Sequence, residues 1–221
     1  FSGSVVLSGT ATDAESGVKN VNVSWSNPSQ PPGSAVISGC TGTTSWSCTW
    51  VTSALADGSY DLYLIVEDNA GNISNTLKRT VTVNNSPPTV TFNSFSPSSG
   101  QYFYASGSTM YFNPAQSGSF NVLINATSTV GVASVAFPAA GASGWSGGSG
   151  SNTTPPSPYA SPTPYTWSGS VGTPAGSPGS LSTTGTDSGG KTANAGFTIQ
   201  ADSGIPVNGT ITYSAGYQST T

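Results

Sequence analysis

The chain has 221 residues, of which only 5% are charged, and its four basic and eight acidic residues give a net charge of −4. Lys78 and Arg79 are its only adjacent cations, so no basic patch can neutralise phosphates, and nucleic acid and anionic membrane surfaces are poor partners. No apolar run approaches the length of a bilayer span, which predicts that the chain does not insert into a membrane. Apolar residues make up 34% of the chain, enough for a packed core, and the length fits one or two domains.

The first half of the chain alternates apolar and polar residues with the period of two that is typical of strands. The predicted strands cover residues 4–12, 18–25, 35–37, 46–50, 60–67 and 77–83. No window keeps a helical period for more than a turn or two, so the chain is predicted to be all-β.

Tyr60 follows the Asp57-Gly58 turn and shares one face of its strand with Leu62, Leu64 and Val66. A tyrosine just after a turn, at the head of a core strand, is typical of the tyrosine corner of sandwich folds. We therefore expect Tyr60 to be a tyrosine corner and residues 60–83 to be the F–G hairpin of an immunoglobulin-like (Ig-like) domain.

The only two cysteines, Cys40 and Cys48, flank a short polar loop between two predicted strands. An even count on opposite arms of a hairpin favours a disulfide formed in an oxidising compartment. Two free buried thiols are the alternative. A structural zinc site is excluded because the sequence has no histidine to add to the two cysteines.

Five segments recur in the same order at a nearly constant offset, which indicates two tandem copies of one domain. The pairs are 2–5 with 117–120, 17–21 with 131–135, Trp50 with Trp167, 68–71 with 187–190, and 81–83 with 197–199.

The repeat divides the chain into a first Ig-like domain at 1–84, whose first strand is missing, a linker at 85–88, and a second domain at 89–200. The second domain carries a Gly/Pro/Ser-rich insertion at about 139–178, in which only 165–167 resembles a strand. The aromatic clusters at 102–104 and 111–112 are predicted to line an added edge hairpin. Residues 201–221 are predicted to be a linker and a surplus strand of the type that opens the second copy, containing Gly209, Thr210, Ile211, Thr212 and Tyr213.

The chain resembles the bacterial Ig-like repeats of very large secreted and cell-surface proteins. Three segments carry this resemblance: the Thr-Asp-x-x-Ser-Gly-Val turn at 12–18, the stretch from Asp57 to Asn72, and the Cys40…Cys48-Thr49-Trp50 hairpin. The resemblance implies two tandem Ig-like antiparallel sandwiches in a secreted or cell-surface protein. It also implies a structural role in an adhesin stalk or filament, with copies of the chain or adjacent repeats as partners.

Asp13, Glu15, Asp68 and Asn69 lie in two turns that would meet at one pole of the sandwich. Their oxygens can hold Ca²⁺, a hard cation, and this is the only cofactor that we consider. The alternative is that these residues cap their own turns, as Asp and Asn often do.

Catalysis is not expected, because the chain has no histidine and no arrangement of a base beside a nucleophile. A glycan- or surface-binding module of a secreted enzyme or adhesin is the alternative function. The aromatic residues Tyr63, Tyr102, Tyr104, Trp145, Tyr159 and Tyr165 can form a stacking platform for sugars, although aromatic residues also pack sandwich cores.

A sandwich that lacks its first strand leaves backbone N–H and C=O groups unpaired along one edge. We therefore expect residues 209–217 to pack into the first domain of the next chain by donor-strand exchange, or to continue covalently into it, giving head-to-tail assembly. The alternative is that the sequence is a window on a longer polypeptide.

Overall fold

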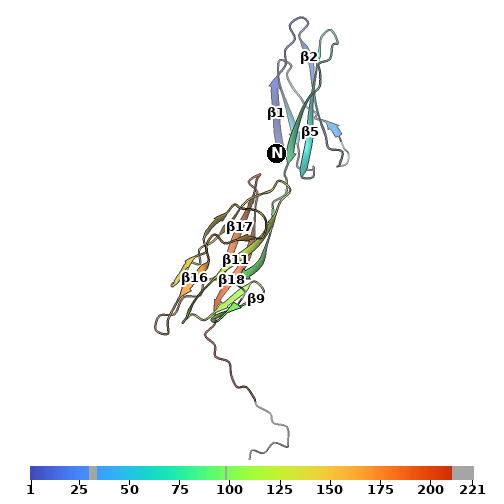
Figure 1. Ribbon diagram of the computed structural model, residues 1–221. Coiled ribbons are helices and arrows are strands. Elements are labelled where there is room, and N and C mark those ends of the chain that lie inside the picture. Colours follow the sequence, from blue (N-terminus) through green and yellow to red (C-terminus); the bar gives the residue numbers. More distant parts are fainter. Residues whose placement is uncertain (30–33, 98, 211–221) are drawn as a thin grey trace, which may run out of the picture.

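The computed structural model describes residues 1–29, 34–97 and 99–210, and it contains two β-sandwich domains that lie end to end (Figure 1). Strands make up the regular structure of these residues, so the prediction of an all-β chain with two tandem Ig-like sandwiches is confirmed. None of the described residues belongs to a helix long and apolar enough to cross a bilayer.

The first domain has a two-stranded sheet facing a four-stranded one. The small sheet pairs β1 (Ser4–Thr10) with β4 (Ser45–Val51), and the larger has the order β3 (Ser34–Val36), β2 (Val18–Ser26), β5 (Gly58–Asp68) and β6 (Leu77–Val83). All neighbours in both sheets are antiparallel. Alternation along β2 turns Val21, Val23 and Trp25 into the core.

Tyr60 is central to the first core. Its ring packs edge to face on Trp25 and Trp50, with centroids 5.5 and 5.9 Å apart. Its hydroxyl donates a 2.9 Å hydrogen bond to the carbonyl of Ala56, four residues upstream, which is the tyrosine-corner bond. Burial raises the pKa of this hydroxyl, which favours the protonated form that donates the bond.

The second domain has a seven-stranded sheet and a five-stranded sheet. The larger has the order β14 (Gly150–Asn152), β12 (Val132–Phe137), β17 (Gly179–Asp187), β18 (Thr192–Ala201), β10 (Thr109–Phe112), β9 (Phe103–Ser106) and β8 (Ser99–Gly100). The smaller has β13 (Trp145–Gly147), β16 (Tyr165–Ser168), β11 (Ser117–Thr127) and β15 (Tyr159–Ala160), with β7 (Thr89–Ser96) on the other edge of β11. β10 runs parallel to β18, and β9 pairs with β10 as the added edge hairpin that the aromatic clusters predict.

The prediction for the insertion at 139–178 is wrong in one respect, because it contains four short strands (β13 to β16) rather than one. Gly147, Gly148 and Gly150 have positive φ and form the bend between β13 and β14. Strands of two or three residues are too short to show alternation, so a Gly/Pro-rich sequence that contains them looks like a loop.

The sequence repeat is present in the structure as repeated hydrogen bonds. Asn69 N donates to Gly17 O in the first domain (3.1 Å), and Ser188 N donates to Gly131 O in the second (3.0 Å). Gly17 and Gly131 both have positive φ, 77° and 85°. At the opposite ends of the domains, Asn84 N donates to Phe1 O and Asp202 N to Phe112 O. These pairs fix which residues of the two domains are equivalent.

Candidate functional site

The first domain has an open edge that the second domain lacks. Within the described ranges, β1 pairs only with β4, whereas its equivalent β11 carries β7 on the edge that is free in β1. The missing first strand expected from the sequence corresponds to this edge.

A hollow of 390 Å³, which we call the open groove, lies beside the free edge. It is lined mainly by apolar side chains from both sheets: Val6, Leu7, Val23, Trp46, Leu62, Leu64 and Leu77. Leu7, Leu62 and Leu64 are only partly buried. On β11, by contrast, the inward residues Phe120, Val122 and Ile124 are at most 1% exposed. The core of the first domain is therefore open along β1.

The predicted assembly strand is only partly within the described residues. Gly209 and Thr210 are exposed and belong to no strand, and Ile211, Thr212 and Tyr213 lie outside the described residues. In sequence, residues 210–213 (Thr-Ile-Thr-Tyr) match the Thr-Val-Thr-Phe that opens β7. In β7, Val90 is buried and Phe92 packs against the core.

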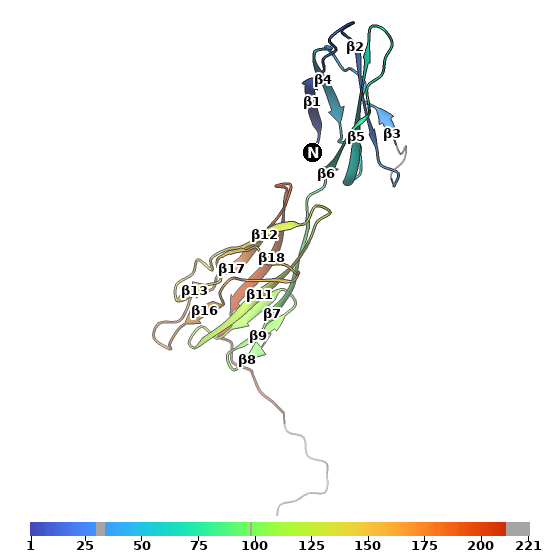
Figure 2. The same ribbon diagram turned by 45° about the horizontal axis from the view of Figure 1, so that its top comes forward.

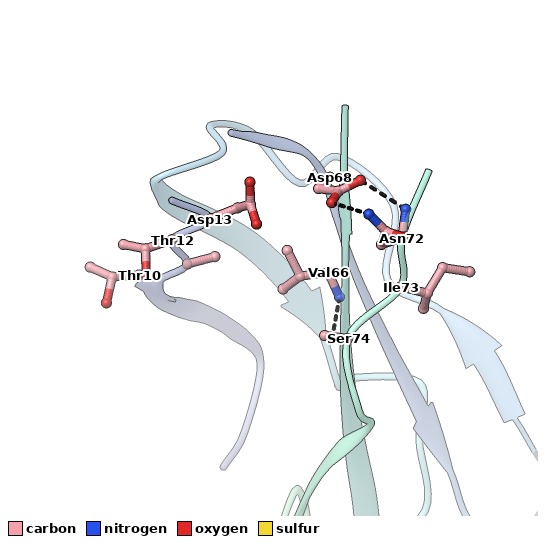
Figure 3. A pocket seen from close by; sticks show the side chains of 9 residues that line it. Thr10, Thr12, Asp13, Val66, Asp68, Asn72, Ile73 and Ser74 are labelled. Carbon is pink, nitrogen blue, oxygen red and sulfur yellow. Dashed lines mark hydrogen bonds between the residues drawn. The ribbon is translucent and has the colours of Figure 1, made fainter. Parts of the chain in front are cut away.

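The two turns predicted to hold Ca²⁺ do meet at the pole of the first domain, where Asp13 and Asp68 face one hollow of 340 Å³ from opposite sides (Figure 3). Oδ1 of Asp13 accepts from the backbone N–H groups of Glu15, Ser16 and Gly17 at 3.2, 2.8 and 2.8 Å. These bonds, chiefly that from Ser16, hold the pKa of Asp13 below its usual value. Asp13 therefore caps its own turn.

The other residues of this prediction also act locally. Asp68 accepts from the side chain and backbone of Asn72 at 2.7 and 2.8 Å, and the side-chain bond is the main reason that its pKa is lowered. Nδ2 of Asn69 donates to the carbonyls of Ser16 and Gly17. In the described part of the chain, no three His, Cys, Asp or Glu residues group as a metal would require. The hollow brings together two of the predicted carboxylates, Asp13 and Asp68, and Ca²⁺ binding there stays a prediction.

A joint between the domains contains a buried carboxylate whose role the sequence does not show. Asp187, 1% exposed, accepts from Nδ2 of Asn84 at 2.9 Å, across the domain boundary. It also accepts from Ser128 Oγ at 3.4 Å and from the N–H groups of Gly189 and Lys191, both at 2.9 Å. Burial by itself raises the pKa of Asp187, but these hydrogen bonds outweigh it and lower the pKa. A charged carboxylate thus ties Asn84 to the second domain.

The linker after Asn84 is tied to the first domain. The carboxylate of Asp57 accepts from the N–H groups of Asn85 and Ser86. Nδ2 of Asn85 donates to the carbonyls of Thr52 and Leu55, at 2.7 and 2.9 Å. Two prolines follow directly, which restricts the backbone further. Hydrogen bonds therefore tie the linker to the first domain and Asn84 to the second.

The aromatic platform is not formed as predicted. Tyr159 and Tyr165 are in the core of the second domain, and the Tyr165 hydroxyl donates to Pro138 O at 2.6 Å. Trp145 packs against the same core and donates from Nε1 to Gly176 O. These positions alternate inward along short strands, so their rings stabilise the domain. Tyr102 and Tyr104 remain near the surface, where they line a separate hollow with Tyr111.

The remaining predicted site, the disulfide, is structural, as are two surface ion pairs that the sequence does not predict. The Cys40–Cys48 disulfide is present, which confirms that prediction. Glu67 pairs with Lys19 at 2.6 Å and Asp61 pairs with Lys78 at 2.8 Å, both on the surface. These acidic side chains hold strands together.

Residues 7–85 match the family model of the bacterial Ig-like domain. No curated protein sequence matches the chain. Several solved structures resemble it. The fibronectin(III)-like modules of Clostridium thermocellum CbhA are 16% identical, with a TM-score of 0.34 and coverage of 90% of this chain and 86% of that one.

The D00–D0 domain of intimin is 12% identical, with a TM-score of 0.39 and coverage of 88% and 92%. The sialic acid binding region of the Streptococcus sanguinis SK1 adhesin is 12% identical, with a TM-score of 0.29 and coverage of 90% and 74%. Identities and TM-scores this low say nothing about function.

Proposed function

We propose, on the premise that residues 7–85 form a bacterial Ig-like domain, that the chain is a structural module of an extracellular array, an adhesin stalk or filament, and not an enzyme. The open groove beside β1 carries this proposal, because it is an incomplete sandwich core that a further strand would complete. The disulfide and the low charge support an extracellular setting.

The occupant that we assign to the open groove is the 209–217 segment of an adjacent copy, supplied by a separate chain or by the neighbouring repeat of one polypeptide. β7 gives the expected register, since Phe92 lies opposite Ile124, Thr91 opposite Asn125 and Val90 opposite Ala126. The equivalent pairs in the open groove are Tyr213 with Gly9, Thr212 with Thr10, and Ile211 with Ala11. Burying the Ile and Tyr side chains would contribute roughly 1.5–3 kcal/mol each, in addition to the new backbone hydrogen bonds.

We propose that the contact between adjacent copies has the same geometry as the contact between the two domains of one chain, where Asn84 and Ser128 donate to Asp187. Between copies, more of the equivalent residues are carboxylates. Asp202 directly follows β18 as Asn84 directly follows β6, and their N–H groups donate to the carbonyls of the equivalent residues Phe112 and Phe1, respectively. In the first domain of the next copy, Asp68 is equivalent to Asp187 of the second domain, and Asp13 is equivalent to Ser128. The amide and hydroxyl donors of the internal joint are thus both replaced by acidic residues.

Three carboxylates would converge at such a joint: Asp202 of one copy with Asp13 and Asp68 of the next. Like charges this close repel unless a cation bridges them, and Ca²⁺ prefers oxygen ligands of this kind. The calcium prediction therefore becomes a proposal for a site shared by two copies. Glu15 and Asn69 would stay in their turns beside it.

A strand-addition experiment tests the groove. A chain ending at Ala201 should be monomeric by light scattering and should bind a synthetic 205–221 peptide, measured by calorimetry. A matched peptide with Ile211→Ser and Tyr213→Ser should bind at least tenfold more weakly, because it loses the two buried side chains. If both peptides bind equally, or neither binds, the open groove is not a strand acceptor.

A second experiment tests the shared site. Sedimentation of the full chain should show more self-association with Ca²⁺ than with EDTA. The D13S/D202N variant gives the contact between copies the same residue types as Ser128 and Asn84 of the contact within the chain. Only one carboxylate then remains there, so its association should not depend on Ca²⁺. Equal association of the unaltered chain in Ca²⁺ and EDTA would contradict the calcium proposal and leave the groove proposal standing.

Glycan binding is the second candidate function. The observation that favours it is the tyrosine-lined hollow of the second domain.

A further inference from the structure

The outer face of the added hairpin carries a row of aromatic and polar side chains. Tyr104 of β9 lies directly opposite Tyr111 of β10, with Ser99 on the other side of Tyr104 and Gln200 on the other side of Tyr111. Residues paired across a ladder point to the same face, so both rings project from one side of the sheet. Tyr104 is 64% exposed, so a ligand in solvent can reach its ring.

The row borders a hollow of 320 Å³, at the small end of the range for ligand pockets. Its lining includes the rings of Tyr102, Tyr104 and Tyr111, the amides of Gln101 and Asn113, and the carboxylate of Asp202. Figure 2 shows β8 and β9 at the end of the second domain that is far from the first. No hydrogen bond within the described ranges uses the hydroxyl of Tyr102, Tyr104 or Tyr111, although buried Tyr60 and Tyr165 both have acceptors.

We propose that this hollow binds a neutral saccharide. Tyrosine offers a rigid ring with a polar tip at little cost in conformational entropy, and the faces of sugar rings present C–H groups that pack on such rings. The hydroxyls at the sugar rim match the amide, carboxylate and phenol groups around the hollow, which both donate and accept. One or two sugar units fit this size better than a long chain.

The charges around the hollow select against anionic sugars. Asp202 is its only charged lining residue. Lys19, Lys78 and Arg79 belong to the first domain, and Lys191 lies roughly 30 Å away along β18, at the other end of that strand. Without a cation nearby, a sialic acid or uronic acid carboxylate would be repelled.

A proline-rich peptide is the competing occupant, since tyrosine-lined grooves also dock polyproline helices. The amides and the carboxylate favour the saccharide, because a polyproline peptide has no N–H groups to donate to them. The experiment therefore compares the binding of a proline peptide with the binding of neutral sugars.

The experiment is a titration of the full chain with neutral tetrasaccharides (cellotetraose, maltotetraose and chitotetraose), with 3′-sialyllactose, and with a proline decapeptide, followed by saturation-transfer NMR. At least one neutral sugar should bind, with saturation strongest at its ring C–H protons. Y104A should weaken it about tenfold or more, because the sugar ring loses an aromatic surface to pack against. Y63A is the matched control and should leave binding unchanged, because the structure places Tyr63 on β5 of the first domain, outside this hollow.

Failure to bind any neutral sugar overturns the proposal. It is equally overturned if 3′-sialyllactose or the decapeptide binds more tightly than the neutral sugars, or if Y104A and Y63A behave alike. Tyr104 is exposed, so its loss should not unfold the domain, which a circular dichroism melt checks. The open-groove proposal does not depend on the outcome, because it rests on the first domain, whereas the proposed calcium site shares Asp202 with this hollow.

Discussion

Removing the disulfide should destabilise the first domain and leave the second unchanged. In C40A/C48A the unfolded chain regains the freedom of the loop between two cysteines separated by eight positions. The chain-entropy relation for a loop of this length gives about 2.5 kcal/mol at 25 °C. A domain of 60–100 residues loses about 4–8 °C of Tm for each kcal/mol, so the first transition should fall by roughly 10–20 °C.

Differential scanning calorimetry on the full chain measures both domains at once. The second domain has no cysteine, so its transition is an internal control, and reduction of the unaltered chain should reproduce the effect of the two substitutions. A shift of the first transition below about 3 °C, or an equal shift of both transitions, would refute the reasoning. The first result would mean that the bond contributes little, and the second that the domains do not unfold independently.

Three further predictions concern single side chains. Y60F keeps the ring in the core but loses the bond to Ala56 O, and should lower the unfolding free energy of the first domain by about 1 kcal/mol in urea titrations. The lowered pKa of Asp187 means that its stabilisation is fully present above the unfolded value of about 3.9 and is lost as the pH falls through its folded pKa. N84A removes the hydrogen bond to Asp187, and should therefore lower the free energy of unfolding by roughly 1–2 kcal/mol at pH 7. Its difference from the unaltered chain should shrink toward pH 2 in urea titrations, and a difference that is constant with pH would contradict this role. D13N should lower the Tm of the first domain in EDTA, because a neutral amide oxygen is a weaker acceptor for three backbone N–H groups; an unchanged Tm would mean that the turn does not need the charge.

The sequence predicts those features that depend only on residues close together in the chain. Tyr60 and its hairpin follow from a turn and a period-two strand, and the disulfide follows from two cysteines in one hairpin. The strands β13 to β15 were missed because two or three residues carry no period. Tyr159 and Tyr165 were placed on a surface platform because composition cannot separate a core ring from an exposed one.

The joint was missed for a different reason. Asn84 and Asp187 are 103 positions apart, and in the sequence each looks like an ordinary turn residue. The signal that could have found the joint is the repeat itself. Asp68 and Asp187 are equivalent, but only Asp187 accepts a hydrogen bond from the other domain. Asp187 therefore marks the place where the two domains meet.

The most direct test of the central claim is a register-specific cross-link between copies of the full chain. The proposed register places Thr212 of one copy opposite Thr10 of the next, with Cβ atoms about 4.5–5.5 Å apart, close to the separation that a disulfide needs. The T10C/T212C variant, mildly oxidised, should therefore give disulfide-linked multimers on non-reducing gels. The T10C/I211C variant, whose second cysteine is one residue out of register and faces the other side of the strand, should run as a single chain on the same gels. Multimers from both variants, or from neither, would contradict the account that a strand of one copy completes the first domain of the next.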